Sequence, residues 1–504
     1  MLGVWDRVGA AVAWPLVNSL VTALRHPALW FVLSGGFAAY LCALYSLGAP
    51  PLPLIYPDST TYWRAHSIVP LGYPALIHAL YGATGTLKSV IVFQIVAFGA
   101  SVLTLQAGVN ALTRNAPLAG ILALLLLGYH GLPFNSLILL TEAPFTAVLL
   151  LHVASAAFAL ARDSKVGLVG MALTAVVAVS LRPSGYFLFG GIVLLALVWR
   201  GRHALVARWA IAPLVLFTAI FVTIGLAVRG IATQAFTGIV VFPHVAYLYD
   251  GGGDVPPETE RQLLKAIEPF RIERGQRIGW SERTEYERAN YGPVTRAVLD
   301  VIKAGLPGRD DNDVTASLAR HTIAKHPVEY AMLAARATVH GFFLVSLTAP
   351  RFTAADLQSF HVNAERPRYR PGLESAMGTK FAFDPKSDQG KYFLLTRYPI
   401  PQIGNFGKWR FLLLAWAGLA TMASWAMVLL GSRTSPGVVF TAYVSALLVG
   451  AYALMGLSTA IISRYGVPLD VLLIVTMVMG TSIWSGGRGQ DITSPANGVD
   501  QPLR

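Results

Sequence analysis

Long apolar stretches, separated by short polar connections, dominate the pattern of hydrophobic and polar positions along the chain. Many contain about 18 to 25 mainly apolar residues, enough for a helix to cross a hydrocarbon core of about 30 Å. Membrane β-strands would instead alternate apolar and polar residues over about ten positions. The pattern therefore predicts an all-α polytopic membrane protein with about ten spanning helices, at residues 28–48, 89–112, 117–130, 136–160, 166–181, 184–199, 209–228, 409–431, 437–457 and 467–484.

Polar and charged segments divide the chain into five parts with different predicted environments. In order, we expect a cytoplasmic interfacial helix without a cleaved signal (1–27), an N-terminal transmembrane module with its first outer loop at 49–88 (28–229), an extracytoplasmic insertion (230–408), C-terminal transmembrane helices (409–485) and a disordered cytoplasmic tail (486–504). The insertion holds most of the 26 acidic residues. Its Arg309-Asp310-Asp311-Asn312-Asp313 run resembles a loop-borne cation site only loosely, and a solvated turn is the favoured interpretation.

One stretch inside the insertion decides how many times the chain crosses. Residues 327–350 are apolar enough to suggest a further span, but Glu329, Arg336 and His340 fall within it. If this stretch crosses, Arg464 lies on the cytoplasmic side; if it does not, Arg464 returns to the outer face. We interpret it as an interfacial or re-entrant helix, which gives ten spans.

Charge sets the orientation and excludes several classes. Basic residues such as Arg114, Arg162 and Arg200 follow alternate spans, and this positive-inside bias places the other connections outside the cell. Hydrophobic residues make up 54% and charged residues 13% of the chain, with a mean hydropathy of +0.55, as in integral membrane proteins. The net charge of +13 comes from scattered residues, so we expect no nucleic-acid partner. Cys42 is the single cysteine, which excludes an intramolecular disulfide and a cysteine-based zinc site.

Two isolated carboxylates are the first candidates for chemistry. Asp58 and Glu142 are the only acidic residues between Arg7 and Arg162, and both fall in or beside predicted outer connections, Asp58 in the first loop. In a partly dehydrated cleft such a carboxylate becomes basic enough to accept a proton from a hydroxyl. The ordinary alternative is helix capping, because both residues stand at sequence patterns typical of helix starts.

Two arginines and several aromatic residues share the same predicted face. Arg182 and Arg464 each begin a span from the outer side, and guanidinium groups suit phosphate oxygens; the alternative is that they reach lipid headgroups or pair with helix ends. Asp470 is either a partner of Arg464 or an interior residue. Near Asp58 we assign substrate binding to three residues, Tyr62, Arg64 and Tyr73, although an interface belt explains most aromatic residues there.

Together these short motifs resemble a known superfamily. They are Asp-Ser-x-x-Tyr from Asp58, Gly-Tyr-Pro from Gly72, Thr-Glu at Glu142, Arg-Pro-x-Gly from Arg182 and Arg-Tyr-x-x-Pro from Arg464. Their order and sidedness resemble the GT-C superfamily of glycosyltransferases that use polyprenyl-phosphate sugars, which includes bacterial aminoarabinose, arabinofuranosyl and protein O-mannosyl transferases. The resemblance covers mainly residues 28–228 and the last span, and it implies a GT-C-like bundle.

The resemblance also implies roles for individual residues. Asp58 matches the catalytic acid of the first outer loop, and Arg182 and Arg464 match positions near the lipid phosphate. The chain has Asp58-Ser59 where the mannosyltransferases have an Asp-Glu pair. It contains no evident Asp-x-Asp metal motif, so no metal ligand is assigned and the use of a divalent metal is left open.

The expected function is an inverting sugar transfer on the outer face of a bacterial inner membrane. The donor would be a polyprenyl-phosphate sugar and the acceptor a hydroxyl of a cell-envelope glycan, lipid or protein. Asp58 would act as the base, while Glu142 would hold the acceptor or orient Asp58 through water. A lipid or solute transporter or flippase is the rival from another class, and it would place charges near the bilayer midplane. A polymerase or ligase of lipid-linked glycans is a third reading.

Overall fold

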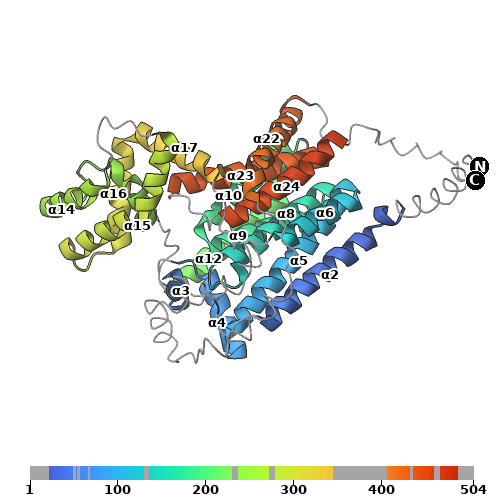
Figure 1. Cartoon of the computed structure of the whole chain (residues 1–504), viewed down its shortest axis with the longest axis horizontal. Helices are drawn as coiled ribbons and strands as arrows, with labels where there is room; N and C mark the ends of the chain where they lie inside the picture. The colour runs from blue at the N-terminus through green and yellow to red at the C-terminus, as the bar shows by residue number, and fades with distance from the viewer. Residues whose placement is uncertain are drawn as a thin grey trace, which may run out of the picture.

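The chain folds as a helical bundle with a smaller helical domain at one end (Figure 1). The computed structural model describes residues 22–48, 53, 57–65, 69–129, 135–229, 237–271, 279–343, 406–431, 435–458 and 466–485. Within these residues the regular structure is helical, without strands. Six helices are long and apolar enough to cross a membrane: Pro27–Gly48, Lys88–Thr113, Glu142–Arg162, His203–Val228, Phe411–Leu430 and Pro436–Leu457. The prediction of an all-helical protein with several membrane-spanning segments is confirmed at this level.

Ten helices of the bundle correspond to the ten apolar stretches of the sequence. They are α2 (Pro27–Gly48), α5 (Lys88–Thr113), α6 (Ala116–Gly128), α8 (Glu142–Arg162), α9 (Lys165–Leu181), α10 (Phe187–Val198), α12 (Ala212–Arg229), α22 (Phe406–Leu430), α23 (Pro436–Ser458) and α24 (Gly466–Ser485). The largest difference from an expected boundary is at α8, which begins at Glu142 rather than at residue 136. Pro144 fits this start, because proline is well tolerated in the first turn of a helix and disfavoured further inside it.

Two short helices lie within the segment predicted as the first outer loop, residues 49–88. α3 (Pro57–Trp63) begins with a proline, and α4 (Gly72–Thr84) has Pro74 in its first turn. Gly85 ends α4 in a left-handed conformation (φ 69°), and its N–H donates to the carbonyl of Tyr81. Asp58 therefore lies in the first turn of a short helix within the connection between α2 and α5.

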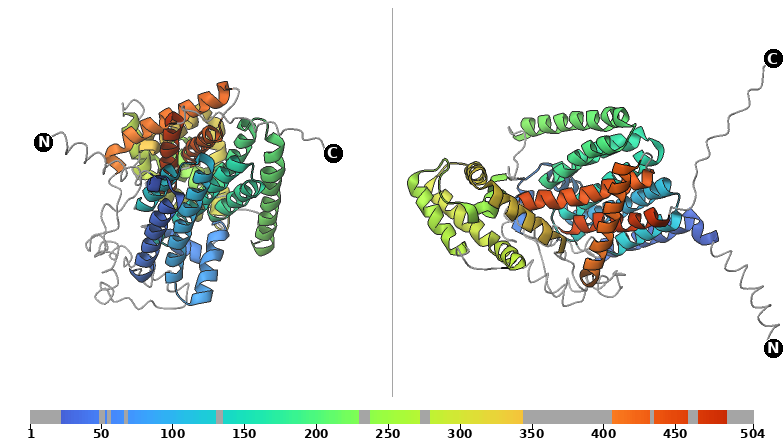
Figure 2. Two further views of the ribbon diagram at one scale, coloured as in Figure 1. Left: turned by 90° about the vertical axis from the view of Figure 1, so that its right-hand side faces the viewer. Right: turned by 90° about the horizontal axis from the view of Figure 1, so that it is seen from above.

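Close helix contacts hold the bundle together. Gly108 lets α5 approach α8, since a Cβ there would lie 3.0 Å from the carbonyl oxygen of Ala154. Gly120 on α6 similarly leaves room for the indole of Trp30 on α2. α12 lies along an outer edge of the bundle, where Val215 and Leu216 are exposed (Figure 2). An apolar surface of this kind is what a helix presents to lipid.

Polar contacts join distant segments at the end of the bundle away from the smaller domain. Arg200, after α10, donates to the carbonyl oxygens of Leu429 (3.0 Å) and Gly431 (2.8 Å) at the end of α22. Arg202 pairs with Asp163, between α8 and α9, at 2.5 Å. The C-terminal ends of α8, α10 and α22 therefore lie at the same end, as helices that alternate in direction require.

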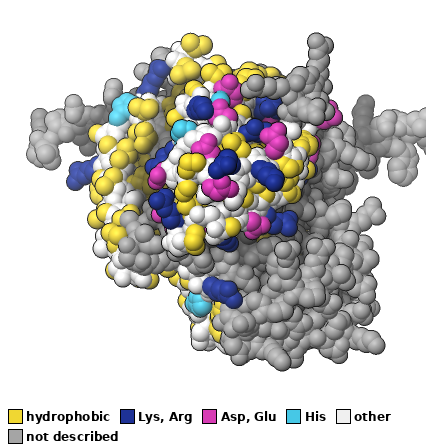
Figure 3. Space-filling view, turned by 90° about the vertical axis from the view of Figure 1, so that its left-hand side faces the viewer, with side chains coloured by type: hydrophobic (Ala, Val, Ile, Leu, Met, Phe, Trp, Pro, Cys, Tyr) yellow, Lys and Arg dark blue, Asp and Glu magenta, His cyan; other side chains and the backbone are white. Residues whose placement is uncertain are grey.

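The smaller domain has its own hydrophobic core. Its elements are α13 (Thr237–Val245), η3 (Ala246–Leu248), α14 (Pro257–Ile267), η4 (Glu268–Phe270), α15 (Trp280–Gly305), α16 (Asp311–Lys325) and α17 (Pro327–Phe343). Positive and negative side chains are mixed over its outer face (Figure 3). Asp310 caps α16, accepting from the backbone N–H groups of Asn312 (2.8 Å) and Asp313 (3.1 Å). This acidic run thus serves as a helix cap.

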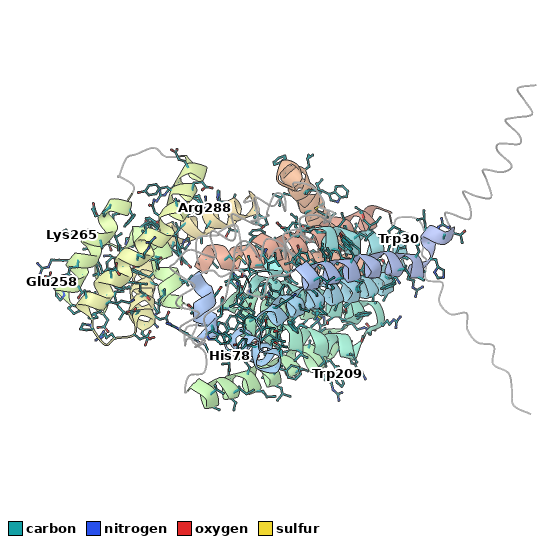
Figure 4. The ribbon with its side chains drawn as sticks, turned by 60° about the horizontal axis from the view of Figure 1, so that its bottom comes forward. Trp30, His78, Trp209, Glu258, Lys265 and Arg288 are labelled. Atoms are coloured by element: carbon teal, nitrogen blue, oxygen red, sulfur yellow. The ribbon has the colours of Figure 1, made fainter. Side chains whose placement is uncertain are left out.

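α17 connects the smaller domain to the bundle. Near its start, the Tyr330 hydroxyl donates to the carbonyl oxygen of Leu457 at 2.5 Å, and near its end the Phe342 ring lies 4.1 Å from that of Tyr452. Both contacts fall on the last two turns of α23. Both ends of α17 consequently lie beside the same end of α23. Figure 4 shows Trp30 at the end of the bundle farthest from Glu258 and Lys265 of the domain.

Candidate functional site

A buried ion pair between α8 and α9 is the centre of the candidate site. The Arg182 Nη1 and Glu142 Oε1 atoms are 3.5 Å apart, and the two side chains are 13% and 3% exposed. This distance exceeds the roughly 2.7–2.9 Å of a tight charge-assisted hydrogen bond. The two charges therefore attract each other without a short hydrogen bond that would fix their relative positions.

The chain places the two charges together through a helical hairpin. Glu142 is the first residue of α8, where a carboxylate is stabilised by the positive end of the helix dipole. α8 and α9 are joined by a short turn at Asp163, which has a left-handed backbone (φ 49°). Arg182 directly follows α9, in an extended conformation before Pro183. The start of α8 and the end of α9 therefore meet at one end of the hairpin.

The surroundings of Arg182 are apolar on one side and polar on the other. Its guanidinium carbon lies 6.0 Å from the centre of the Phe145 ring, within cation–π range. The hydroxyl of Ser184, two residues further on, is buried and has no hydrogen-bond partner among the described residues. The guanidinium of Arg182 provides donors that suit a phosphate.

α3 is fixed to the segment that precedes Glu142. The Ser59 hydroxyl donates to the carbonyl oxygen of Leu139 at 2.9 Å. One turn later, the hydroxyl groups of Tyr62 and Thr141 are 3.5 Å apart. Asp58 is next to Ser59 in α3, so its backbone lies at the same end of the bundle as Glu142. The Asp58 side chain lies outside the described residues.

Tyr73 links α4 to this arrangement. It is fully buried, its hydroxyl donates to Gln94 Oε1 at 3.3 Å, and its ring meets that of Tyr62 edge to face at 5.2 Å. Gln94 in turn donates to the carbonyl oxygens of Ser136 (2.8 Å) and Ile138 (3.2 Å). Burial, followed by the nearby Tyr62 and Glu142, raises the pKa of Tyr73 well above its ordinary value, so the phenol remains a donor. Tyr73 is thus close enough to Glu142 to sense its charge.

Other predicted residues stand apart from the ion pair. Arg64 is exposed just after α3, and no contact joins it to Glu142 or Arg182 among the described residues, so its role in substrate binding stays a prediction. Trp63 is buried and stacks on His78, with ring centres 4.4 Å apart. Trp63 is therefore a packing residue.

The last span contributes a second buried carboxylate. Asp470 of α24 accepts a hydrogen bond from the Tyr129 hydroxyl, at the end of α6, at 2.6 Å. Both residues are almost completely buried. Arg464 lies outside the described residues, so its phosphate-binding role is untested. No group of three His, Cys, Asp or Glu side chains that could hold a metal ion occurs in the described part of the chain.

A further polar cluster lies deeper in the bundle. His152 Nε2 is 2.6 Å from the Tyr443 hydroxyl of α23, and its Nδ1 is 3.0 Å from the Thr174 hydroxyl of α9. His152 is ten residues beyond Glu142 on α8, which corresponds to about 15 Å along the helix. This cluster joins three helices in the interior and is separate from the ion pair.

Sequence reasoning identified the charges of the site but missed its polar supports. Gln94 and Tyr129 were not singled out, and Thr141 only as part of the Thr-Glu motif, although Gln94 is one of few strongly polar residues in an apolar helix, which is a usable signal. The pairing of Glu142 with Arg182 was also not anticipated. No protein-family model matches the chain, and no curated protein matches it.

Proposed function

We propose that the protein is an integral membrane glycosyltransferase with a GT-C-like fold. It would move a sugar from a polyprenyl-phosphate donor to a hydroxyl of a cell-envelope glycan, lipid or protein. The observation that carries the proposal is the buried Glu142–Arg182 pair, at the end of the bundle to which α3, the helix of Asp58, is fixed. A base and a phosphate-binding cation at one edge of a membrane bundle match this chemistry.

In the proposed reaction the acceptor oxygen attacks the anomeric carbon from the side opposite the phosphate. The bond from that carbon to the phosphate oxygen breaks, and its electron pair leaves with the polyprenyl phosphate. Asp58 takes the acceptor proton. The configuration at the anomeric carbon is inverted because there is a single displacement. Arg182, together with Arg464 from the sequence prediction, stabilises the negative charge that develops on the leaving phosphate.

Glu142 has a more specific role here than the sequence suggested. Its carboxylate holds the Arg182 guanidinium at 3.5 Å without the short contact of a tight pair. The bound donor is a phosphodiester with one negative charge, and its phosphate gains a second negative charge as the bond to the sugar breaks, so its attraction for the guanidinium is strongest in the leaving phosphate. Glu142 therefore keeps Arg182 in position before the donor binds, and its ion pair with Arg182 loosens as the second negative charge develops on the leaving phosphate.

The arrangement of helix ends supports an outer-face site with ten crossings. The basic residues Arg200 and Arg202 lie at the end opposite the Glu142–Arg182 pair, as expected for a cytoplasmic end. Because both ends of α17 lie beside the same end of α23, a non-crossing α17 is favoured. The pair, α3 and the smaller domain then face outward from a bacterial inner membrane.

The transporter alternative rests on the cluster at His152. A titratable side chain roughly 15 Å along α8 from the ion pair is the kind of interior group that proton-coupled transport uses. Product analysis separates the two functions. A transferase yields an acceptor that carries the sugar and a free polyprenyl phosphate, whereas a transporter leaves the donor chemically unchanged.

The test is a transfer assay with purified protein, a labelled polyprenyl-phosphate sugar and a membrane extract as acceptor. Asp58→Asn should lower the transfer rate by about 10²-fold or more, since a general base contributes about 10²–10⁴-fold. Asp163→Asn is the matched control, because it removes an exposed carboxylate at the opposite end of the bundle. Wild-type rates from a folded Asp58→Asn protein would exclude Asp58 as the base. Absence of any sugar-bearing acceptor with the wild type would reject the transferase proposal.

A further inference from the structure

A groove on the outside of the bundle lies apart from the ion pair. It is about 500 Å³ in volume and runs between α4 and the first turns of α5. Figure 1 shows these two helices side by side, and Figure 4 marks α4 by His78. The wall formed by Val92, Phe93 and Val96 is apolar, and Phe93 and Val96 are exposed. The volume is within the roughly 300–1,000 Å³ of ligand pockets.

Lys88 gives this groove a positive end. It is the first residue of α5, where a cation opposes the helix dipole and an anion is favoured. Its ammonium group has no ion-pair or hydrogen-bond partner among the described residues. Some other cations of the bundle are matched: Lys165 lies over the Trp209 ring, and Arg202 pairs with Asp163. Lys88 is therefore a site of uncompensated positive charge at the groove.

Two of the three hydroxyl groups that line the groove donate to backbone carbonyl oxygens, and the third, of Thr86, accepts from the backbone N–H of Lys88 at 3.2 Å. The Thr84 hydroxyl donates to the carbonyl oxygen of Leu80 at 2.7 Å, and the Ser89 hydroxyl donates to that of Thr86 at 2.7 Å. The ammonium group of Lys88 then provides the charged contact for a ligand. One cation suits a singly charged phosphodiester better than the dianionic phosphate of a monoester.

We propose that this groove binds an anionic phospholipid of the surrounding bilayer. Its phosphate contacts Lys88, and an acyl chain follows Val92, Phe93 and Val96. Val96 is eight residues beyond Lys88, about 12 Å along a helix that is itself a candidate span, so the groove runs from headgroup level into the hydrocarbon. This site is separate from the proposed substrate site and does not depend on the transferase function.

A lipid in this groove would also stabilise the helix packing next to the candidate site. Leu80 lines the groove and also packs against the cluster that contains Trp63 and Tyr73. An acyl chain that packs against Leu80 therefore stabilises the contact of α4 with the helices that carry the site. A bound lipid should raise the thermal stability of the protein, and it should also be detected as added mass in a mass spectrum.

The experiment measures lipid binding by native mass spectrometry of the delipidated full-length protein. Phosphatidylglycerol should bind wild type in preference to zwitterionic phosphatidylcholine. Lys88→Gln should weaken phosphatidylglycerol binding about fivefold, the effect of one basic residue on an anionic lipid surface. Lys265→Gln is the matched control, because it removes a lysine from α14 of the smaller domain. Val96→Trp fills the groove and should abolish the adduct while it keeps Lys88.

Three results would overturn the proposal. The first is equal binding of phosphatidylglycerol to wild type and to a folded Lys88→Gln protein. The second is equal binding of the two phospholipids to wild type. The third is displacement of phosphatidylglycerol by an equal concentration of polyprenyl monophosphate, which would assign the groove to the substrate lipid instead. Elution volume and helix content of each variant verify that it is folded.

Discussion

Replacing Glu142 by glutamine tests how strongly the ion pair contributes to stability. The substitution keeps the shape of the side chain but removes its charge, so the Arg182 guanidinium is left in a mostly buried position without its carboxylate. At 3.5 Å the Coulomb attraction is about 5 kcal/mol for an effective dielectric constant of about 20. Desolvation of both groups offsets part of this attraction.

The expected net effect is smaller than for a tight buried pair. Removing one partner of a buried pair commonly costs about 3–5 kcal/mol. Arg182 remains 13% exposed and keeps the Phe145 ring beneath it, so we expect Glu142→Gln to lower the free energy of unfolding by about 2–3 kcal/mol. Arg182→Gln should cost more, because the Glu142 carboxylate is only 3% exposed. The double variant should be about 1–2 kcal/mol more stable than the sum of the single effects predicts.

The assay is reversible unfolding in mixed micelles of a mild detergent and SDS, followed by tryptophan fluorescence. The same double-mutant cycle for Asp163 and Arg202 is the control, because that pair has a shorter contact of 2.5 Å but side chains 43% and 50% exposed. An exposed pair contributes about 0–1 kcal/mol, so burial and not distance should decide the result. The reasoning is refuted if the Glu142 and Arg182 effects add within about 0.5 kcal/mol.

Three further predictions concern other parts of the structure. Gly72→Ala should destabilise the protein by about 1–3 kcal/mol in the same assay, because its Cβ would meet backbone at the end of α9, whereas Gly82→Ala, in open space, should have little effect. Tyr443→Phe should cost about 1 kcal/mol by removing the hydrogen bond to His152, and an unchanged midpoint would show that the bond contributes nothing. Burial raises the pKa of Glu287 above 4.5 despite Arg336, so the folded domain binds an extra proton just above that pH. Stability should therefore fall as pH rises through this window, and thermal unfolding of Glu287→Gln should lack that slope.

Apolar length was enough to predict the helices of the bundle but not the elements of the first outer loop. A window long enough to cross a bilayer is recognised in any sequence context, which explains the agreement for helices such as α5 and α23. α3 has only seven residues, too few for any periodic pattern. The segment before Glu142 is apolar yet irregular, because its backbone groups bond to Gln94 and Ser59 rather than to a helix.

The site could be predicted as a shared face but not as a set of contacts. Counting spans places Glu142 and Arg182 at the same end, whatever their exact geometry. Their pairing depends on how α8 and α9 are rotated about their axes, and helices that are apolar all round carry no pattern that fixes this rotation. Tyr129 and Asp470 meet for the same reason, through packing between α6 and α24 that the sequence does not display.

The hydrogen bond between Tyr129 and Asp470 has a consequence for biosynthesis. The two residues are 341 positions apart in the chain. At about 5–20 residues per second, Tyr129 is synthesised roughly 17–70 s before its partner. His152 is likewise synthesised before its partner Tyr443, which lies 291 positions later in the chain. During translation the first seven helices of the bundle therefore carry buried polar groups without their final partners. These hydrogen bonds form only after the last two helices of the bundle have been synthesised, so the polar interior of the bundle is completed late.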